Sequence, residues 1–206
     1  MKCDMIFKSK KNFHKSNFSC RRIGVMGLGP RSGTTHIAVA ICNYLSDTEK
    51  KRVALIEQSR HDDIGRLIMS LGAEEDAEAY TFHRVTYVPY STVKQTGGLT
   101  ELNSDCMVFD FGCDVKNCMS SMLLCDIRIL VGTDAPWRAK EYEKIGELLP
   151  SNGSRADWRL FVNLGNACNL KEKDRYFITS GCFPFEPDPV YPGGETTKFI
   201  REMIYV

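Results

Sequence analysis

The sequence lacks the long apolar runs and paired cysteines that mark membrane-spanning and disulfide-stabilised proteins. No apolar stretch reaches the roughly 18 residues that a membrane-crossing helix needs, and the N-terminus lacks the apolar segment of a secretory signal. The nine cysteines include no Cys-x-x-Cys pair, and several fall within predicted strands or helices. We therefore expect a cytoplasmic protein with buried free thiols. Zinc binding by Cys113, Cys118 and Cys125 is disfavoured, because no second ligand pair stands at a usual spacing.

The net positive charge of the chain is confined to its first residues. The net charge of the 206 residues is +1, but residues 1–22 alone carry seven basic side chains and one acid, a net +6 that leaves −5 for the rest. We predict that residues 1–21 form a basic leader, most simply a solvated, disordered arm, although such a cluster could also contact acidic lipid or nucleic acid. The negative balance of the remainder argues against a nucleic-acid-binding face on the domain.

Residues 22–206 are predicted to form a single α/β domain, since a chain of 206 residues with 43% hydrophobic content suits one core. Short apolar runs alternate with helical patterns, which is typical of a mostly parallel sheet covered by helices. The acidic segment Gly72 to Phe82 is predicted to be exposed. The predicted strands are Ile23 to Leu28, Arg52 to Glu57, Arg84 to Pro89, Cys106 to Phe111, Ile127 to Gly132, Trp158 to Asn163 and Tyr176 to Ser180. The predicted helices are Thr35 to Ser46, Asp62 to Leu71, Val115 to Leu124, Pro136 to Leu149 and Glu195 to Ile204.

A glycine-rich turn, Gly27-Leu-Gly-Pro-Arg-Ser-Gly-Thr-Thr35, joins the first predicted strand to the first predicted helix. In the phosphate-binding consensus G-x-x-x-x-G-K-[ST], main-chain amides cradle phosphates, the lysine reaches the outer phosphates and the hydroxyl binds Mg²⁺. Gly33 and Thr35 match the last glycine and the hydroxyl, whereas Leu28 and Thr34 stand where the first glycine and the lysine are expected. The predicted phosphate cradle consists of Gly29, Pro30, Arg31, Ser32, Gly33, Thr34 and Thr35.

Polar residues close three later strands of the predicted sheet, namely Glu57, Asp110 and Asn163. Ligands of open parallel sheets sit at the carboxyl ends of the strands, so these side chains are candidates for a site. Asp110 ends an apolar run, which suits a carboxylate that holds Mg²⁺ through water beside Thr35. A carboxylate that merely caps the next turn is the alternative interpretation. His36 could adjoin a phosphate, but histidines on helix surfaces more often have a structural or solvated role.

Over about residues 22 to 206 the chain resembles the MinD/ParA family of P-loop ATPases, the deviant Walker A group. The resemblance implies a P-loop NTPase-like three-layer sandwich with a mostly parallel, doubly wound sheet. It also places Asn163 and Pro184 beside the adenine of ATP or ADP, and Thr35 and Asp110 at Mg²⁺, the latter through water. The matching pieces, in the family's order, are Arg22 to Gly27, Gly33 to Leu45, Val53 to Glu57, Asp110 to Gly112, Cys125 to Thr133, Phe161 to Asn163 and Phe183 to Asp188.

The chain departs from that family at its charged positions. Gly29 stands where the family carries a lysine that reaches the nucleotide of a dimer partner, and Thr34 stands at the second lysine. Arg31 is the remaining cation of the loop and could substitute in part. Glu57-Gln-Ser59 replaces the family's Asp-x-Asp, whose second aspartate is linked to hydrolysis. Weak nucleotide binding and slow or absent hydrolysis are therefore expected.

Two other functions are weighed against this one. Gly27-x-Gly29 with Gly33 approximates a dinucleotide fingerprint, and Glu57 could then bind the ribose of NAD(P). Alternatively, the fold serves as an interaction module without nucleotide, with the helix from Pro136 and its Trp137 as a partner surface. Atypical loops resemble those of the pilus-assembly members CpaE and TadZ, which implies a spatial or assembly regulator of pilus, secretion or partitioning type, with protein partners and a homodimer as one option.

Overall fold

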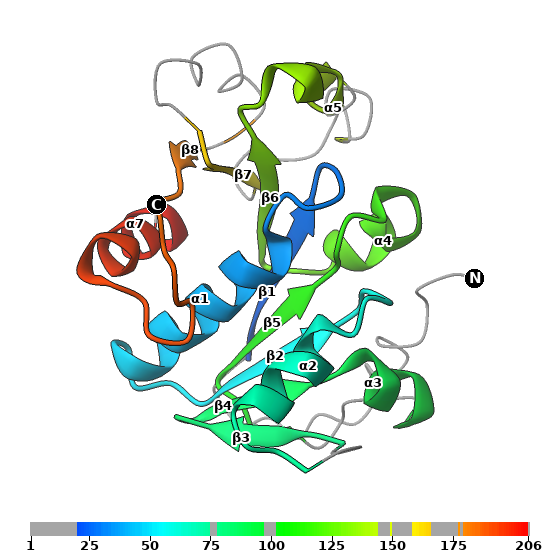
Figure 1. Ribbon diagram of the computed structural model, residues 1–206, viewed down its shortest axis with the longest axis vertical. Coiled ribbons are helices and arrows are strands. Elements are labelled where there is room, and N and C mark those ends of the chain that lie inside the picture. The colour runs from blue at the N-terminus through cyan, green and yellow to red at the C-terminus, as the bar shows by residue number, and fades with distance from the viewer. Residues whose placement is uncertain are drawn as a thin grey trace.

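The computed structural model describes residues 20–74, 78–96, 102–143, 149, 158–165, 177 and 179–205. Eight strands form one sheet in the order β3-β4-β2-β5-β1-β6-β7-β8, parallel throughout except for β3, which is antiparallel to β4 (Figure 1). The strands are β1 (Arg21–Gly27), β2 (Val53–Glu57), β3 (Tyr80–Phe82), β4 (Val85–Val88), β5 (Cys106–Asp110), β6 (Ile127–Thr133), β7 (Trp158–Asn163) and β8 (Thr179–Cys182). The helices are α1 (Thr34–Asp47), α2 (Asp63–Ser70), α3 (Tyr90–Thr96), α4 (Val115–Met122), the 3₁₀ turn η1 (Pro136–Arg138), α5 (Ala139–Glu143) and α7 (Gly194–Ile204).

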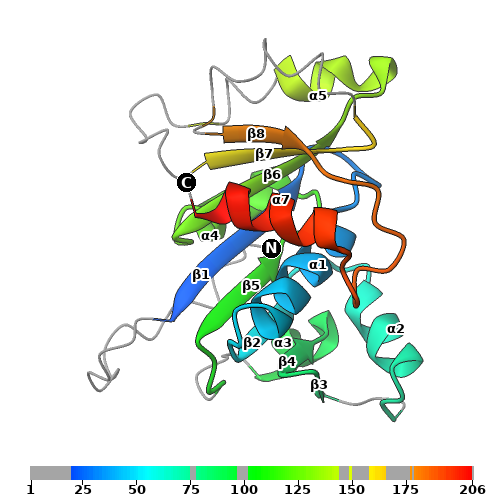
Figure 2. The ribbon, with the colours of Figure 1, turned by 90° about the vertical axis from the view of Figure 1, so that its left-hand side faces the viewer.

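Helices cover both faces of the sheet, and each face has its own apolar core. The first core joins α1, α2 and α7 to the sheet through residues such as Ile41, Ile68 and Ile200. The second lies under α4, where Met122 packs with Phe109. Figure 2 shows α1, α2 and α7 on the near side of the sheet. A strand that is buried on both faces carries apolar side chains on both faces, so the central strands appear in the sequence as continuous hydrophobic runs. The predicted three-layer, mostly parallel sandwich is confirmed.

The order of the strands places the first strand at the centre of the sheet. β1 lies between β5 and β6, and β5 separates it from β2. In the dinucleotide-binding order 3-2-1-4-5-6, by contrast, the first two strands are neighbours. The observed order therefore disfavours the NAD(P) alternative and brings Asp110, at the end of β5, beside the turn that follows β1.

The acidic segment is less exposed than the sequence predicted. Its last three residues, Tyr80–Phe82, form β3 and pair with β4, and the Tyr80 hydroxyl donates to the carbonyl of Leu71 at 3.1 Å. Residues 75–77 of the segment lie outside the described part of the chain. The prediction that this segment is exposed is therefore wrong at its end. Tyr80 and Phe82 are partly buried, because β3 pairs with β4 and packs near the end of α2.

Element boundaries differ from the predictions in a few places. β1 begins at Arg21, the final residue of the predicted leader, while residues 1–19 lie outside the described structure. The last strand, β8, begins at Thr179, three residues later than the predicted start at Tyr176, and ends at Cys182. The predicted helix from Pro136 opens as a 3₁₀ turn and continues as α5 to Glu143, beyond which residues 144–148 are not described. Helix α3 was not predicted.

The cysteines of the described residues are all free thiols. Cys42, Cys106, Cys118 and Cys125 are buried, as expected from their apolar surroundings. No group of three or more histidine, cysteine or acidic side chains that could hold a metal exists among the described residues. Among the helices of this part, none has the length and apolarity to cross a membrane.

Candidate functional site

The turn between β1 and α1 is anchored to both neighbouring strands. The Gly27 amide donates to the carbonyl of Gly112, just after β5, at 2.7 Å, and the Leu28 amide donates to Val131 in β6 at 2.9 Å. The turn then folds back so closely that a Cβ at Gly27 would collide with the Ser32 and Thr34 hydroxyls. A side chain at this position would open the turn, so glycine is required there.

Gly33 ends the turn and begins α1 with an open N-terminus. Its φ of 89° lies in the left-handed region that favours glycine, and no side chain caps the helix. The first turn of α1 also contains no acidic residue. Free amides and the positive end of the helix dipole therefore face the turn, which is the arrangement that binds anions at a helix N-terminus.

Thr34, at the position of the missing lysine, points into the turn. Its hydroxyl lies 3.1 Å from that of Ser32, and the two residues are 7% and 1% exposed. Pro30 and Arg31 form the exposed tip of the turn, and Arg31 adopts a φ of 58°. The turn thus keeps main-chain donors and hydroxyls, while its own cation is directed to the surface.

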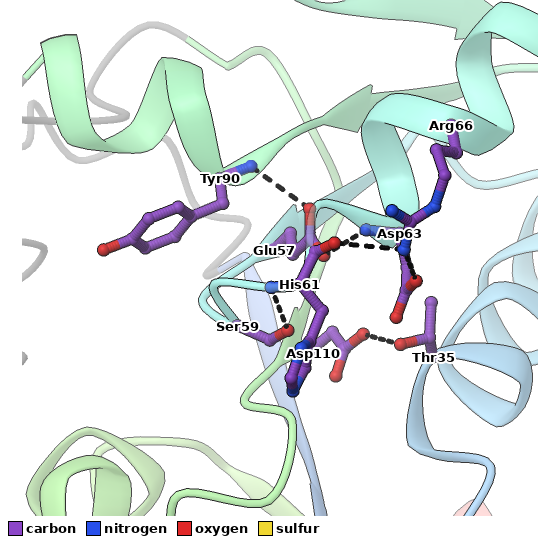
Figure 3. A network of polar contacts seen from close by, with 8 residues as sticks. All are labelled: Thr35, Glu57, Ser59, His61, Asp63, Arg66, Tyr90 and Asp110. Carbon is purple, nitrogen blue, oxygen red and sulfur yellow. Dashed lines mark hydrogen bonds and ion pairs between the residues drawn. The ribbon is translucent and has the colours of Figure 1, made fainter. Parts of the chain in front are cut away.

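The side chains of Thr35 and Asp110 contact each other at the base of the turn, and the Mg²⁺-binding role predicted for them stays a prediction. The Thr35 hydroxyl donates to Asp110 Oδ2 at 2.6 Å (Figure 3). The Gly112 amide donates to Oδ1 at 2.9 Å. Asp110 is completely buried, and burial raises its pKa, an effect that the two hydrogen bonds oppose. The bond from the Gly112 amide, two residues further on, caps the turn after β5 as the alternative interpretation predicted, and the bond from Thr35 is an additional contact that such a cap does not require.

Glu57 lies next to Asp110 across the β2–β5 pairing but faces a different set of partners. Its Oε1 accepts from the Asp63 amide at 2.8 Å, and its Oε2 accepts from the Tyr90 amide at 3.2 Å (Figure 3). Glu57 is fully buried, which raises its pKa to about 7. Both oxygens serve the starts of α2 and α3, and the side chain is fully buried, which disfavours a contact with a ribose.

Asn163, at the end of β7, contacts the turn itself. Its Nδ2 donates to the Ser32 carbonyl at 3.1 Å, and a Cβ at Gly33 would collide with the same amide nitrogen. Pro184 lies in the segment after β8, next to Phe183, which is 5% exposed and stacks on Phe161 with ring centroids 6.2 Å apart. The structure brings Asn163 to the glycine-rich turn between β1 and α1, called the phosphate turn below after its predicted role. The adenine-contacting role predicted for Asn163 and Pro184 stays a prediction.

Two charged residues that the sequence did not single out also contact the turn. Arg138, in η1, donates through Nη2 to the Pro30 carbonyl, and its Nη1 lies 3.6 Å from Glu141 Oε2. The Glu141 carboxylate packs against Gly29, where a Cβ would lie 2.8 Å from Oε2. The sequence feature that could have identified them is their position just after β6, a strand that ends at the same edge of the sheet as β1.

Solved structures show which known proteins share this architecture, although no protein-family model and no curated protein matches the chain. A ParA family ATPase from Chlorobium tepidum is 13% identical, with a TM-score of 0.60 over 89% of this chain and 98% of the other. The MinD cell division protein of Aquifex aeolicus is 16% identical, with a TM-score of 0.63 over 89% and 96%. A nucleotide-binding protein from Archaeoglobus fulgidus in complex with ADP is 12% identical, with a TM-score of 0.62 over 90% and 88%. The chain has the fold of MinD/ParA-type P-loop ATPases, as its sequence predicted.

Proposed function

We propose that this chain is a MinD/ParA-like P-loop protein that binds ATP or ADP with Mg²⁺ weakly, hydrolyses it slowly or not at all, and acts as a spatial or assembly regulator. The Thr35–Asp110 hydrogen bond of 2.6 Å, placed beneath an uncapped helix N-terminus, is the observation that carries the proposal. Burial of a carboxylate without a polar partner costs free energy, and the Thr35 hydroxyl is such a partner for Asp110. A cation bound with the nucleotide would give both side chains a function. The ADP complex of the Archaeoglobus fulgidus protein supports a nucleotide as the ligand.

The oxygen donors of this site suit Mg²⁺ when a nucleotide is present. Mg²⁺ prefers oxygen ligands, keeps several waters, and is usually bound through one or two protein groups plus phosphates. Thr35 would supply its hydroxyl directly, and Asp110 would accept from a water on the ion while still bonded to the Thr35 hydroxyl. The ion would offset charge on the phosphates. Two protein oxygens make a weak site alone, so Mg²⁺ should bind with the nucleotide and not before it.

Poor hydrolysis follows from the groups around the turn. Catalysis of phosphoryl transfer depends mainly on positive charge aimed at the transferred group, and Thr34 provides none. Gln58 and Ser59 follow β2 at the last two positions of the family's Asp-x-Asp pattern, so that Ser59 stands in place of the second aspartate. The two residues are 8% and 7% exposed. The backbone cradle remains, although Pro30 contributes no N–H to it. Binding therefore depends on amides and hydroxyls, while turnover lacks its principal cation.

Restoring the lysine tests the assignment of the turn. Thr34→Lys should tighten binding of ATP–Mg²⁺ by about one to two decades, since a charge-assisted hydrogen bond contributes roughly 1.5 to 3 kcal/mol. Titration calorimetry on the full chain measures the dissociation constants. Thr34→Gln is the matched control, because it lengthens the side chain without adding charge. Equal affinities for the two variants would contradict the assignment.

An interaction module without nucleotide is the second candidate, and exposed apolar side chains favour it. Trp137, Leu164 and Phe185 are 84%, 76% and 84% exposed and follow β6, β7 and β8 respectively. Parallel strands end at one edge, so all three side chains lie on the edge that carries the phosphate turn. Exposed apolar groups gathered in one region mark a protein contact surface. A homodimer, or a partner in pilus, secretion or partitioning machinery, would cover them.

A further inference from the structure

Arg138 and Glu141 form an ion pair that is incompletely satisfied and lies on the phosphate turn. Their side chains are 19% and 23% exposed, and the facing atoms, Arg138 Nη1 and Glu141 Oε2, are buried without a hydrogen-bond partner among the described residues. At 3.6 Å the two atoms are attracted but do not hydrogen-bond. Buried polar atoms without partners are unusual in folded proteins, so an additional ligand between or beside them would lower their free energy.

The other half of the Arg138 guanidinium is already fixed to the turn. Nη2 donates to the Pro30 carbonyl, which belongs to the turn that lacks a lysine. The guanidinium therefore has one nitrogen fixed to the turn, while the other, Nη1, lies beside Glu141 without a hydrogen bond among the described residues. Arginine donates in a rigid fork and binds phosphate oxygens readily, and it can stabilise a phosphoryl group from within the same chain.

Glu141 occupies space that a side chain at Gly29 would take. Its carboxylate touches the Gly29 backbone and faces Arg138, so it partly neutralises the guanidinium. A carboxylate on the turn also repels phosphate. A phosphate that enters the cradle would compete with Glu141 for Arg138 Nη1.

We infer that Arg138 is the phosphate-binding cation of this site in place of the missing lysine, and that Glu141 holds Arg138 Nη1 until a phosphate displaces it. The inference rests on the proposed nucleotide function and assigns its cation. It also predicts that Arg31, at the exposed tip of the turn, contributes less than Arg138.

Charge and hydrogen bonding at position 138 can be separated by two variants. Arg138→Gln removes the charge and keeps a polar but shorter side chain, and Arg138→Lys keeps the charge without the guanidinium fork. We expect Arg138→Gln to weaken binding of ATP–Mg²⁺ by about 10- to 100-fold and Arg138→Lys to weaken it by less than about tenfold, measured by calorimetry. Lys140→Ala, which removes a positive charge from exposed Lys140 in α5, two residues after Arg138, is the matched control and should leave affinity within about twofold. Inorganic tripolyphosphate with Mg²⁺ should show the same ranking, because the contact is to phosphate.

Removal of the competing charge should act in the opposite direction. Glu141→Gln is expected to tighten ATP–Mg²⁺ binding by about three- to tenfold. In the Thr34→Lys background the cost of Arg138→Gln should shrink, because two cations that serve one phosphate are not additive. Thermal unfolding of each variant confirms that the fold is retained.

The outcomes separate this inference from the proposed function. If the wild-type chain and Thr34→Lys both fail to bind ATP–Mg²⁺, the proposed function is wrong and the inference falls with it. If the wild-type chain binds but Arg138→Gln binds equally well, or Arg31→Ala loses more affinity than Arg138→Gln, only the inference is overturned. Unchanged or weaker binding by Glu141→Gln would overturn the displacement of Glu141 by phosphate.

Discussion

A single side-chain amide couples the end of β7 to the phosphate turn. Asn163 donates to the Ser32 carbonyl at 3.1 Å and lies against Gly33, the residue whose left-handed conformation begins α1. With its donor nitrogen used in this way, Asn163 restricts the conformations of the turn before any ligand arrives. Preorganised amides bind charge without a cost of reorganisation, so this contact should matter to affinity as well as to stability.

Substitutions of Asn163 should loosen the turn in a graded way. Asn163→Ala removes one hydrogen bond, worth about 1 kcal/mol, and should weaken nucleotide binding by about fivefold. Asn163→Asp replaces the donor by a carboxylate oxygen beside the Ser32 carbonyl and near incoming phosphates, so it should weaken binding by at least about tenfold. Calorimetry measures both, with Asn117→Ala as a control on α4. If Asn163→Asp bound as well as the wild type, the amide would have no part in shaping the turn.

The residue contacts differ in how far they could be predicted from sequence. Thr35 and Asp110 were predicted because each carries a local signal, a glycine-rich turn for one and the end of an apolar run for the other. The bonds from Asn163 to Ser32 and from Arg138 to Pro30 join residues 131 and 108 positions apart. They depend on β6 pairing with β1 and β7 with β6, which the sequence pattern does not specify, so Arg138 and Glu141 were not singled out.

At the scale of elements, Glu57 joins three of them. The carboxylate ends β2 and accepts the first amides of α2 and α3, at Asp63 and Tyr90. Full burial raises its pKa from 4.5 to about 7. In the folded chain Glu57 therefore retains a proton at pH values where the unfolded chain has lost it, and the free energy of unfolding must fall as pH rises from about 4.5 to about 7.

Glu57→Gln should remove this pH dependence. The stability of the wild type relative to Glu57→Gln is expected to fall by up to roughly 3 kcal/mol as pH rises between 4.5 and 7, and to change little above pH 7. Urea unfolding of both proteins over pH 4.5 to 8 measures the difference. Glu202→Gln, at an exposed position on α7, should track the wild type. A difference between wild type and Glu57→Gln that is flat with pH would show that Glu57 titrates normally.

The elements also show where pattern-based prediction failed. Long apolar runs such as Ile127–Thr133 were found because both faces of a central strand are buried. β3 has only three residues, intermediate or exposed, and α3 follows directly after Pro89, so neither presents a full period of apolar residues. Their positions are set by pairing with β4 and by the Glu57 carboxylate, which are tertiary effects.

For the whole molecule, the parallel sheet gathers ligand groups and apolar groups at one edge. The phosphate turn follows β1, and Trp137, Leu164 and Phe185 follow the three strands on one side of it. A bound nucleotide would change the charge and rigidity of this edge. We therefore expect association through the apolar edge to depend on nucleotide.

Sedimentation velocity distinguishes the two candidate functions at this scale. With ATP–Mg²⁺ the wild-type chain should self-associate more strongly than without it, and the double variant Trp137→Ser with Phe185→Ser should lower the association constant by at least about tenfold, because two large apolar side chains no longer leave water. Met69→Ser is the matched control, since Met69 is 53% exposed on α2. Association that needs Trp137 and Phe185 but is equal with and without nucleotide would favour the interaction module, because the edge would then act independently of the phosphate turn. Association that neither nucleotide nor the double variant alters would contradict a contact role for the edge.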